Sequence, residues 1–333
     1  MRIKKSHLQS ISILIFSLVL FSCNNAAISP YQNIEFTRKS VMPGVGRSAA
    51  VSFVINGKGY VALGRDADRS GQLNDCWEYD PANDHWTEKA AFPGTARVKA
   101  MAATVNGKGY VGLGFDLNFH VYSDRKAYLA DFWMYDPDSD SWSRKADFPS
   151  FATDACVSYV SDSNIYVGGG FNGYRFSNEL WKYDTHLDKW TRLTDFKVPG
   201  RFGGVLCKSP DKIYFGTGYC TWNENDWWEY SPTNGEWKIL KSMPDDGREN
   251  GVALTIDNRY FVMTGKHFAG NLTGGRTLSD INEFDAIRNV WYKRGNIPGT
   301  RANAIAFTIN GTGYIGFGDN DSTVMNDFWS FKP

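Results

Sequence analysis

Apolar and polar residues along this chain form short runs that return at nearly regular distances. Each run is about five residues long, contains a tyrosine and ends in glycine, as in Tyr60–Gly64. Runs of this length bounded by turn residues predict β-strands, and recurrence at about 50 residues predicts a repeat architecture. Six tyrosines mark the repeats: Tyr60, Tyr110, Tyr166, Tyr214, Tyr260 and Tyr314.

Two further signals follow each tyrosine. About fifteen residues later most repeats carry the pattern W-x-Y, and a tryptophan opens the next polar run. Each repeat therefore predicts four short antiparallel strands, and the repeat accounts for most of the tryptophans without an aromatic binding stripe. Ten of the 12 tryptophans occupy these two positions: Trp77, Trp86, Trp133, Trp142, Trp181, Trp190, Trp228, Trp237, Trp291 and Trp329.

The last repeat stops at Pro333, before its fourth strand. The segment 36–39, Phe-Thr-Arg-Lys, matches the fourth-strand segment 142–145, Trp-Ser-Arg-Lys, but has no repeat of its own. We expect the N-terminal segment to complete the sixth repeat, so that the ring has no open edge strand.

The stretch Gly57-Lys58-Gly59-Tyr60-Val61 occurs again at 107–111. A phosphate-binding loop would need a different glycine spacing and a following helix, whereas this stretch leads into a strand. An asparagine precedes each copy, and Asn-Gly is the strongest two-residue hairpin signal. The sequence therefore predicts a structural turn here rather than a ligand loop.

Together, the Gly-ended second strand, the W-x-Y third strand and the fourth-strand tryptophan resemble kelch repeats over residues 31–333. The resemblance implies an all-β fold, a six-bladed kelch-type β-propeller with four antiparallel strands per blade. Only the third repeat, at 168–170, keeps the double glycine of the family. The long second-to-third-strand loops would then share one face, where binding is expected.

The N-terminus predicts export. Residues 1–22 combine a basic start with a short apolar run and read as a lipoprotein-type signal peptide. Cys23 would be the lipidated residue, and 23–30 a short linker; ordinary secretion with cleavage near Ala26 is the alternative. The expected location is the bacterial cell envelope, as an outer-membrane lipoprotein held by its lipid anchor, on the periplasmic side or the cell surface.

Composition narrows the partners. The formal net charge is zero, so no overall basic field favours nucleic acid. We expect a monomer. We also expect no metal or cofactor, because the four remaining cysteines show no metal-binding spacing. Their disulfide pairing stays open from sequence alone; they are Cys76, Cys156, Cys207 and Cys220.

A repeated arginine precedes the first strand of five repeats, with Thr153 in its place in the third. A ring of guanidinium groups at the channel mouth would bind carboxylates or phosphates. The alternative is that each arginine pairs with neighbouring acids or loop carbonyls of its own repeat. The five are Arg47, Arg97, Arg201, Arg248 and Arg301.

A second set of candidates follows the glycine of each second strand and should face the same mouth. His267, Tyr174 and Trp222 lie nearby in the same loops. Aromatic rings beside charged groups suit sugars, although such rings also pack on their own blades. The set comprises Arg65, Phe115, Phe171, Tyr219, Lys266 and Asp319.

Two enzymes with kelch propellers indicate what catalytic residues this chain would need if it were an enzyme. A galactose-oxidase-like copper site is not expected, because only His120 and His267 fall in the mouth loops. Resemblance to bacterial N-acetylneuraminate epimerase would imply an acid–base pair, for which Asp154, Glu249 and Asp319 are available. The leading hypothesis is a non-catalytic propeller that binds a glycan or a protein, anionic ligands included; the alternative is a sugar-modifying enzyme.

Overall fold

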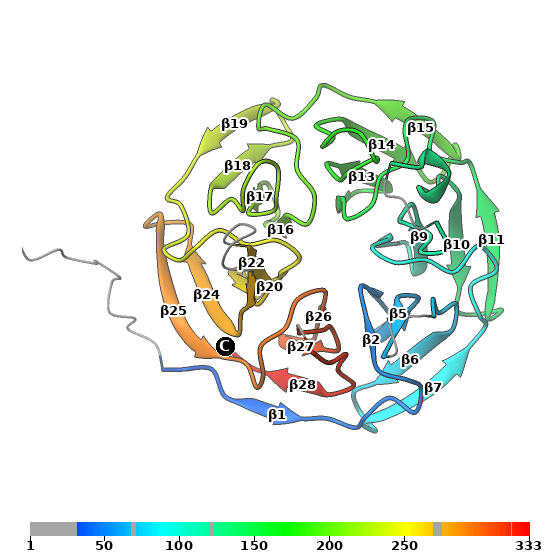
Figure 1. Cartoon of the computed structure of the whole chain (residues 1–333), viewed down its shortest axis with the longest axis horizontal. Helices are drawn as coiled ribbons and strands as arrows, with labels where there is room; N and C mark the ends of the chain where they lie inside the picture. Colours follow the sequence, from blue (N-terminus) through cyan, green and yellow to red (C-terminus); the bar gives the residue numbers. More distant parts are fainter. Residues whose placement is uncertain (1–31, 68–70, 120–122, 269–274, 321) are drawn as a thin grey trace, which may run out of the picture.

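Six four-stranded antiparallel sheets stand around a central axis in the computed structural model (Figure 1). The structure describes residues 32–67, 71–119, 123–268, 275–320 and 322–333. We number the sheets blade one to blade six in chain order. The expected all-β, six-bladed propeller is confirmed.

Each blade runs from an inner strand at the axis to an outer strand at the rim. Blade one consists of β3 (Val51–Ile55), β4 (Lys58–Ala62), β6 (Cys76–Asp80) and β7 (His85–Lys89). Blade two consists of β8 (Met101–Val105), β9 (Lys108–Gly112), β10 (Phe132–Asp136) and β11 (Ser141–Lys145). Blade three consists of β12 (Val157–Ser161), β13 (Asn164–Gly168), β14 (Leu180–Asp184) and β15 (Lys189–Arg192). Blade four consists of β16 (Val205–Lys208), β17 (Ile213–Gly216), β18 (Trp227–Ser231) and β19 (Glu236–Ile239). Blade five consists of β20 (Val252–Ile256), β21 (Arg259–Met263), β24 (Asp280–Asp285) and β25 (Val290–Asn296). Blade six consists of β26 (Ile305–Ile309), β27 (Thr312–Gly316), β28 (Phe328–Phe331) and β1 (Phe36–Arg38).

Blade six is built from both ends of the described chain. Strand β1 pairs antiparallel with β28, with Phe36 opposite Phe331 and Arg38 opposite Trp329. Figure 1 shows β1, in blue, as the outer strand beside the red β28. The expected closure by an N-terminal strand is confirmed, so the ring joins the two ends of the fold without an unpaired strand between them.

The Asn-Gly pairs form the hairpins that the sequence predicts. Asn56 and Gly57 have φ values of 51° and 76°, and Asn106 and Gly107 have 50° and 73°. Two successive positive φ values suit the two-residue hairpin turn whose twist matches the strands. Each Asn-Gly pair therefore turns the first strand of its blade into the second.

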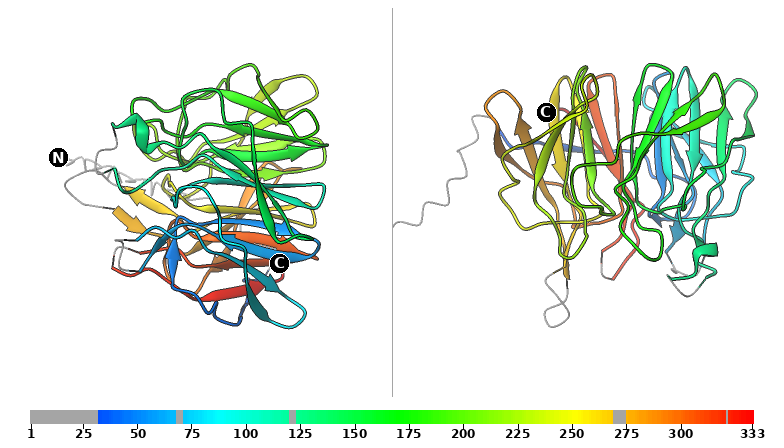
Figure 2. Two further views of the ribbon diagram at one scale, coloured as in Figure 1. Left: turned by 90° about the vertical axis from the view of Figure 1, so that its right-hand side faces the viewer. Right: turned by 90° about the horizontal axis from the view of Figure 1, so that it is seen from above.

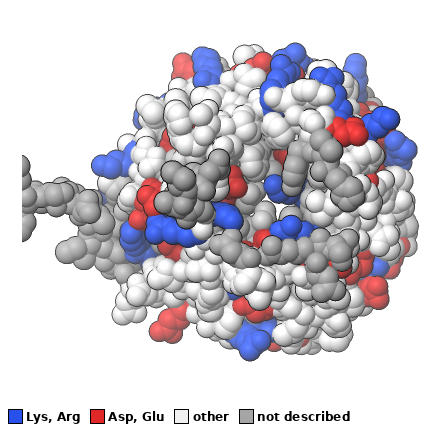
Figure 3. All heavy atoms as spheres, in the orientation of Figure 1, with Lys and Arg blue, Asp and Glu red and all other residues white. Residues whose placement is uncertain are grey.

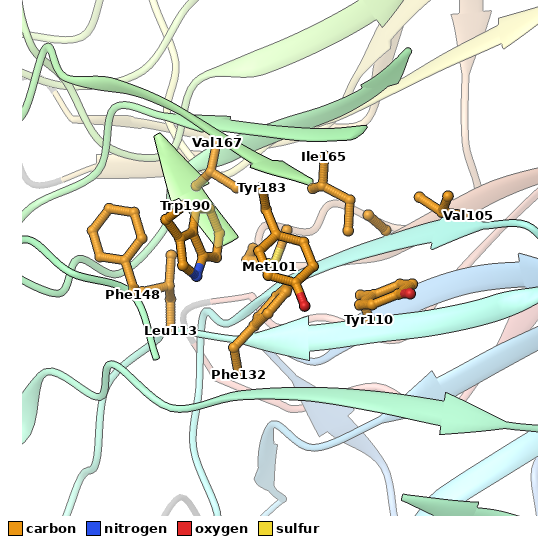
Figure 4. Close-up of a cluster of buried hydrophobic side chains, with 11 residues drawn as sticks. Met101, Val105, Tyr110, Leu113, Phe132, Phe148, Ile165, Val167, Tyr183 and Trp190 are labelled. Atoms are coloured by element: carbon orange, nitrogen blue, oxygen red, sulfur yellow. The ribbon is translucent and has the colours of Figure 1, made fainter. Parts of the chain in front are cut away.

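Facing blades bury their aromatic and aliphatic side chains against one another. Between blades two and three, Phe132 packs edge-on against Tyr183, with ring centroids 4.9 Å apart, and against Trp190 at 5.1 Å (Figure 4). Such pairs add directional contacts to the burial of apolar surface. The core of the molecule is therefore a series of layers between blades.

Two polar contacts, which we call the seam clamp, join the outer parts of neighbouring blades. In the clamp between blades two and three, the indole Nε1 of Trp190 donates to the Ala146 carbonyl at 2.8 Å, and the Ala146 amide donates to Asp188 at 2.8 Å. The same pair of contacts recurs at three more seams, where the acceptor residues are Ser40, Ala90 and Lys241. The fourth-strand tryptophans that mark the repeat thus hold the blades together.

Near the axis, two closed rings of backbone hydrogen bonds run through all six blades. In the first, the amide of Lys99 donates to the carbonyl of Ala49, and equivalent bonds of 2.8 to 3.0 Å continue around the axis. The second ring runs from the glycine after each second strand to the next blade, as from the Gly64 amide to the Arg97 carbonyl, at 2.6 to 3.1 Å. The residues of the first ring are Ala49, Lys99, Ala155, Gly203, Asn250 and Asn303.

The longer connections gather on one face. The short pair β2 (Arg47–Ser48) and β5 (Arg65–Asp66), the pair β22 (Lys266–Phe268) and β23 (Gly275–Thr277), and the 3-10 turn η1 (Arg125–Ala127) all lie there (Figures 1 and 2). We call this the loop face. Within the described residues, no helix is long and apolar enough to cross a membrane.

Deleting residues 32–39 should lower the melting temperature sharply, because blade six would lose β1 and the buried side chain of Ile34. The measurement is thermal unfolding followed by circular dichroism. Deleting 24–30 instead, the linker expected from the sequence, should leave the melting temperature unchanged. An equal melting temperature in the 32–39 deletion would mean that β1 does not close the ring.

Candidate functional site

The five repeated arginines lie inside the blades, with side chains at most 1% exposed. In blade two, Arg97 forms two parallel hydrogen bonds with Asp131 at 2.7 and 2.8 Å and a third with the Leu113 carbonyl. All five arginines repeat this fork, with Asp75, Asp131, Asp226, Asp280 and Asp327 as partners. The geometry supports the alternative that the arginines serve their own repeat, since both terminal nitrogens of each guanidinium bind an aspartate and the side chains are buried.

The tryptophan of the W-x-Y strand completes this arrangement. Trp77 Nε1 donates to Asp75 at 2.7 Å, and Trp133 Nε1 donates to Asp131 at the same distance. Burial opposes ionisation of Asp131, but the hydrogen bonds and charge of Arg97 outweigh it and leave the pKa of this carboxyl below its usual range. The carboxylate therefore stays charged beside its arginine.

Blade three departs from the arrangement at both positions. Thr153 replaces the arginine and Glu179 replaces the aspartate. Glu179 accepts from Trp181 at 2.9 Å, from Ser150 at 2.7 Å and from Arg175 at 3.0 Å. Arg175 reaches this acid from the loop, so blade three keeps the acid and indole but draws its cation from elsewhere.

The residues after each second-strand glycine lie on the loop face as expected. Each pairs through backbone with the residue that follows the repeated arginine or threonine, as Phe171 does with Asp154 and Lys266 with Glu249. These pairs carry two sets of side chains to the region around the axis, which we call the mouth. Figure 3 shows this face, with Lys and Arg atoms at the edge of a central opening.

Lys99 occupies the centre of the mouth. Its ammonium lies 4.0 Å from Asp154 of blade three and 4.9 Å from the ring centroid of Phe202 in blade four. It is also near enough to Glu249, on the opposite blade five, for its charge to act on that carboxyl. One lysine from blade two therefore contacts blades three and four, and its charge also acts on an acid of blade five.

Of the two acids near Lys99, Asp154 is buried and Glu249 is partly exposed. Asp154 is 3% exposed, and one of its carboxylate oxygens has no hydrogen-bond partner in the described structure. Burial raises the pKa of Asp154, and Lys99 offsets only part of this. Burial also raises the pKa of Glu249, against the opposing effects of Lys99, Asn223 and Lys266. These acids hold protons more readily than ordinary carboxylates do.

Blades two to four form an aromatic wall on one side of the mouth. Phe176 stacks on Phe202 with ring centroids 5.9 Å apart and meets Tyr219 edge-on at 5.8 Å. Phe171 continues the wall, at 5.1 Å from Phe176 and 6.2 Å from Tyr128. Four of these rings, Phe171, Phe176, Phe202 and Tyr219, are partly exposed, whereas Phe115 is buried beneath Tyr128. Part of the wall can therefore contact a ligand.

The other side of the mouth is polar. Arg65 of blade one forms an ion pair with Asp319 of blade six at 2.7 Å and donates to the Ser48 hydroxyl at 2.8 Å. Asn303 donates to Asp319 at 2.9 Å. The mouth thus sets a partly exposed aromatic wall against amides, a hydroxyl and paired charges.

The remaining candidates stand apart from this arrangement. His267 meets the Gly247 carbonyl through Nδ1 at 2.7 Å, and Tyr174 lies under the Arg125 guanidinium at 4.4 Å. Trp222 is 64% exposed and makes no ring contact with the wall. His120 and Cys23 lie outside the described residues. The described residues contain no group of three or more possible metal ligands, and their four cysteines are free thiols.

Comparison with known proteins agrees with the architecture. A family model for the kelch motif matches residues 156–197. The protein is a six-bladed β-propeller that contains a kelch motif. The solved structure of YjhT superimposes on this propeller with a TM-score of 0.75, covering 89% of this chain and 99% of that one at 19% identity, a likeness that shows the fold alone. No curated protein matches the sequence.

Sequence reasoning named Asp154 and Glu249 but missed Lys99 and Phe202. The two missed residues follow repeated arginine positions in different blades, and only the closed ring brings them together. The structural role of the arginines could have been predicted from the sequence. An acid stands two residues before the W-x-Y tryptophan in five repeats, and the one glutamate among these acids coincides with Thr153.

Replacing Arg97 by alanine should lower the free energy of unfolding by about 3 to 5 kcal/mol, because it leaves Asp131 partly buried without its partner. Denaturant unfolding measures this change. The matched control is Arg144→Ala, whose ion pair with Asp147 is exposed and should contribute less than about 1 kcal/mol. Equal effects of the two substitutions would contradict a structural role for the buried fork.

Asp154→Asn should raise the melting temperature at neutral pH, and the gain should shrink as the pH falls towards about 4. The pKa of Asp154 is raised in the folded state, so the ionised form costs stability once the unfolded carboxyl has lost its proton. Thermal unfolding across this pH range measures the difference. Asp138→Asn, at a carboxylate that is 83% exposed, is the control and should change little. A gain that does not depend on pH would contradict the assigned charge effect.

Proposed function

We propose that this kelch propeller is a non-catalytic binding protein that holds a glycan at the mouth of its loop face. The observation that carries the proposal is the aromatic wall facing a polar side across the mouth. A sugar ring has one apolar face, which packs on an aromatic ring, and a rim of hydroxyls that need donors and acceptors. The mouth offers both kinds of surface within one opening.

The charges of the mouth favour a glycan that is at most weakly acidic. Lys99, Arg65 and Lys266 stand beside Asp154, Asp319 and Glu249, so cations and carboxylates balance. The five buried arginines add no donors, because their forks are occupied. A carboxylate on the ligand would meet Lys99 or Arg65 only in competition with these partners.

We further propose that the protein is an envelope lipoprotein anchored through Cys23. The support is the sequence of residues 1–23, a basic start, an apolar run and a cysteine after a small residue. Metabolic labelling with palmitate should mark the wild-type protein but not Cys23→Ser. Labelling of both forms would remove the basis for this assignment.

A glycan array probed with the purified protein tests the proposed function, and calorimetry on a retained glycan then measures affinity. Phe202→Ala should weaken binding about tenfold, because it removes the ring at the centre of the wall and the contact with Lys99. Trp222→Ala is the control, since that exposed ring lies apart from the wall, and it should bind like the wild type. Retention of no glycan, or equal loss in both variants, would contradict binding at the mouth.

A second function rests on Asp154 and Glu249. A buried and a partly buried carboxyl, both with raised pKa values and near one lysine, suit proton transfer to and from a sugar. The protein would then be a sugar epimerase or mutarotase. Nuclear magnetic resonance of acidic sugars should show that the wild type accelerates the interconversion of their epimers or anomers, and that Asp154→Asn and Glu249→Gln abolish this acceleration. If the wild type gives no acceleration, the enzyme function is contradicted and the binding function stands.

A further inference from the structure

The seam between blades three and four lacks the clamp that joins four other seams. The connection from Trp190 to Arg201 has the same length as the equivalent Trp142–Thr153 connection, so its length does not explain the missing clamp. Gly235 stands where Asp84, Asp140 and Asp188 stand in blades one to three. Throughout this fully described region, Trp237 Nε1 has no hydrogen-bond partner, in contrast to Trp190 and its equivalents.

Rings that are buried at other seams are partly exposed here. Tyr166 and Tyr230 both have exposed surface, whereas their equivalents in blade one, Tyr60 and Tyr79, are 2% and 0% exposed. Tyr230 packs at a tilt against Trp237 with centroids 4.7 Å apart, and Tyr166 stacks on Tyr159 at 4.5 Å. Together they line a groove of about 480 Å³ between the two blades, which is within the size range of ligand sites.

The groove also contains a buried hydroxyl without a partner. Tyr159 is 7% exposed and its hydroxyl makes no hydrogen bond in the described structure. In blades one to three the third-strand tyrosine, equivalent to Tyr230, donates to the turn aspartate, as Tyr183 does to Asp188 at 2.6 Å. Gly235 offers no such acceptor to Tyr230. An unpaired buried hydroxyl costs stability, so the Tyr159 hydroxyl destabilises the free protein.

The polar groups that remain available in the groove are the indole Nε1 of Trp237, the ammonium groups of Lys182 and Lys197, and the hydroxyls of Tyr166, Thr194 and Tyr230, which can donate or accept. The side-chain acceptors at the edge, Asp195 and Asn234, already bind Arg192 and the Glu236 amide. A ligand that presents flat apolar surface together with acceptors therefore matches the groove.

We propose that this groove, which we call the seam groove, binds an extended proline-containing segment of a partner protein. Pyrrolidine rings are flat and apolar, and a polyproline helix exposes its carbonyls as acceptors while carrying no amide donors. Grooves lined by aromatic residues recognise such segments in other folds because the helix is ordered before binding.

The seam groove and the mouth are separate sites. The groove is lined by strands and connections of blades three and four, and none of its lining residues belongs to the aromatic wall or to the polar side of the mouth. The proposal therefore stands whether or not the mouth binds a glycan. Phe202→Ala should leave binding at the seam groove unchanged.

Calorimetry with an acetylated and amidated oligoproline of ten residues tests the proposal on the purified protein. Trp237→Phe keeps the ring contacts but removes the indole donor, and it should weaken binding about threefold to tenfold. Trp86→Phe removes the same donor at the clamped seam between blades six and one. This control should lower the melting temperature and leave the affinity unchanged.

Two further variants separate binding from folding. Tyr159→Phe should raise the melting temperature, because it removes the unpaired hydroxyl, and should leave the oligoproline affinity unchanged, because that hydroxyl is enclosed. Gly235→Asp should raise the melting temperature and weaken oligoproline binding about threefold to tenfold, by giving Tyr230 the acceptor found in blades one to three; the positive φ of 72° suits aspartate, as at Asp84. Absence of oligoproline binding, binding unaffected by Trp237→Phe and Gly235→Asp, or a neutral oligosaccharide that binds the groove in its place would overturn the proposal.

Discussion

The two closed rings of backbone hydrogen bonds around the axis are the constraint on which the rest of the structure depends. Each blade accepts from one neighbour and donates to the other, so that no blade can leave without breaking bonds on both sides. The geometry requires a left-handed residue in every blade, with φ between 49° and 63°. Glycine and asparagine tolerate this conformation at three positions, whereas Ala49, Lys99 and Ala155 adopt it at a cost that the closed ring offsets.

The buried arginines support these rings rather than compete with them. Each guanidinium binds the carbonyl of the residue just before a ring glycine, as Arg97 binds that of Leu113 before Gly114, and its aspartate is fixed by the W-x-Y indole in four blades. Repetition thus assigns structural roles to the most regular residues. The two proposed binding sites lie where the repeat varies. One is formed by the residues after the arginines at the mouth, and the other lies at the seam between blades three and four.

The period of the sequence was enough to predict the blades, the hairpins and the closure by 36–39, because these depend on local pattern and on counting. The burial of the arginines could also have been predicted from their coincidence with the acid before each W-x-Y strand. The contact of Lys99 with Phe202 could not be predicted from the sequence. Lys99, Asp154, Phe202 and Glu249 belong to four different blades and come near one another only after the ring closes. The seam groove could be predicted only in part: Gly235 in place of the turn aspartate is visible in the sequence, but the exposed rings and the unpaired Tyr159 hydroxyl are not.

Native-state hydrogen exchange measures the strength of the rings most directly. The account predicts that the six first-ring amides, those of Ala49, Lys99, Ala155, Gly203, Asn250 and Asn303, exchange only through global unfolding and share one free energy. At the outer seams, the Thr194 amide should exchange much faster than the clamped amides of Ala90 and Ala146. Ring amides that exchange at widely different free energies, or a Thr194 amide as protected as that of Ala146, would contradict the account.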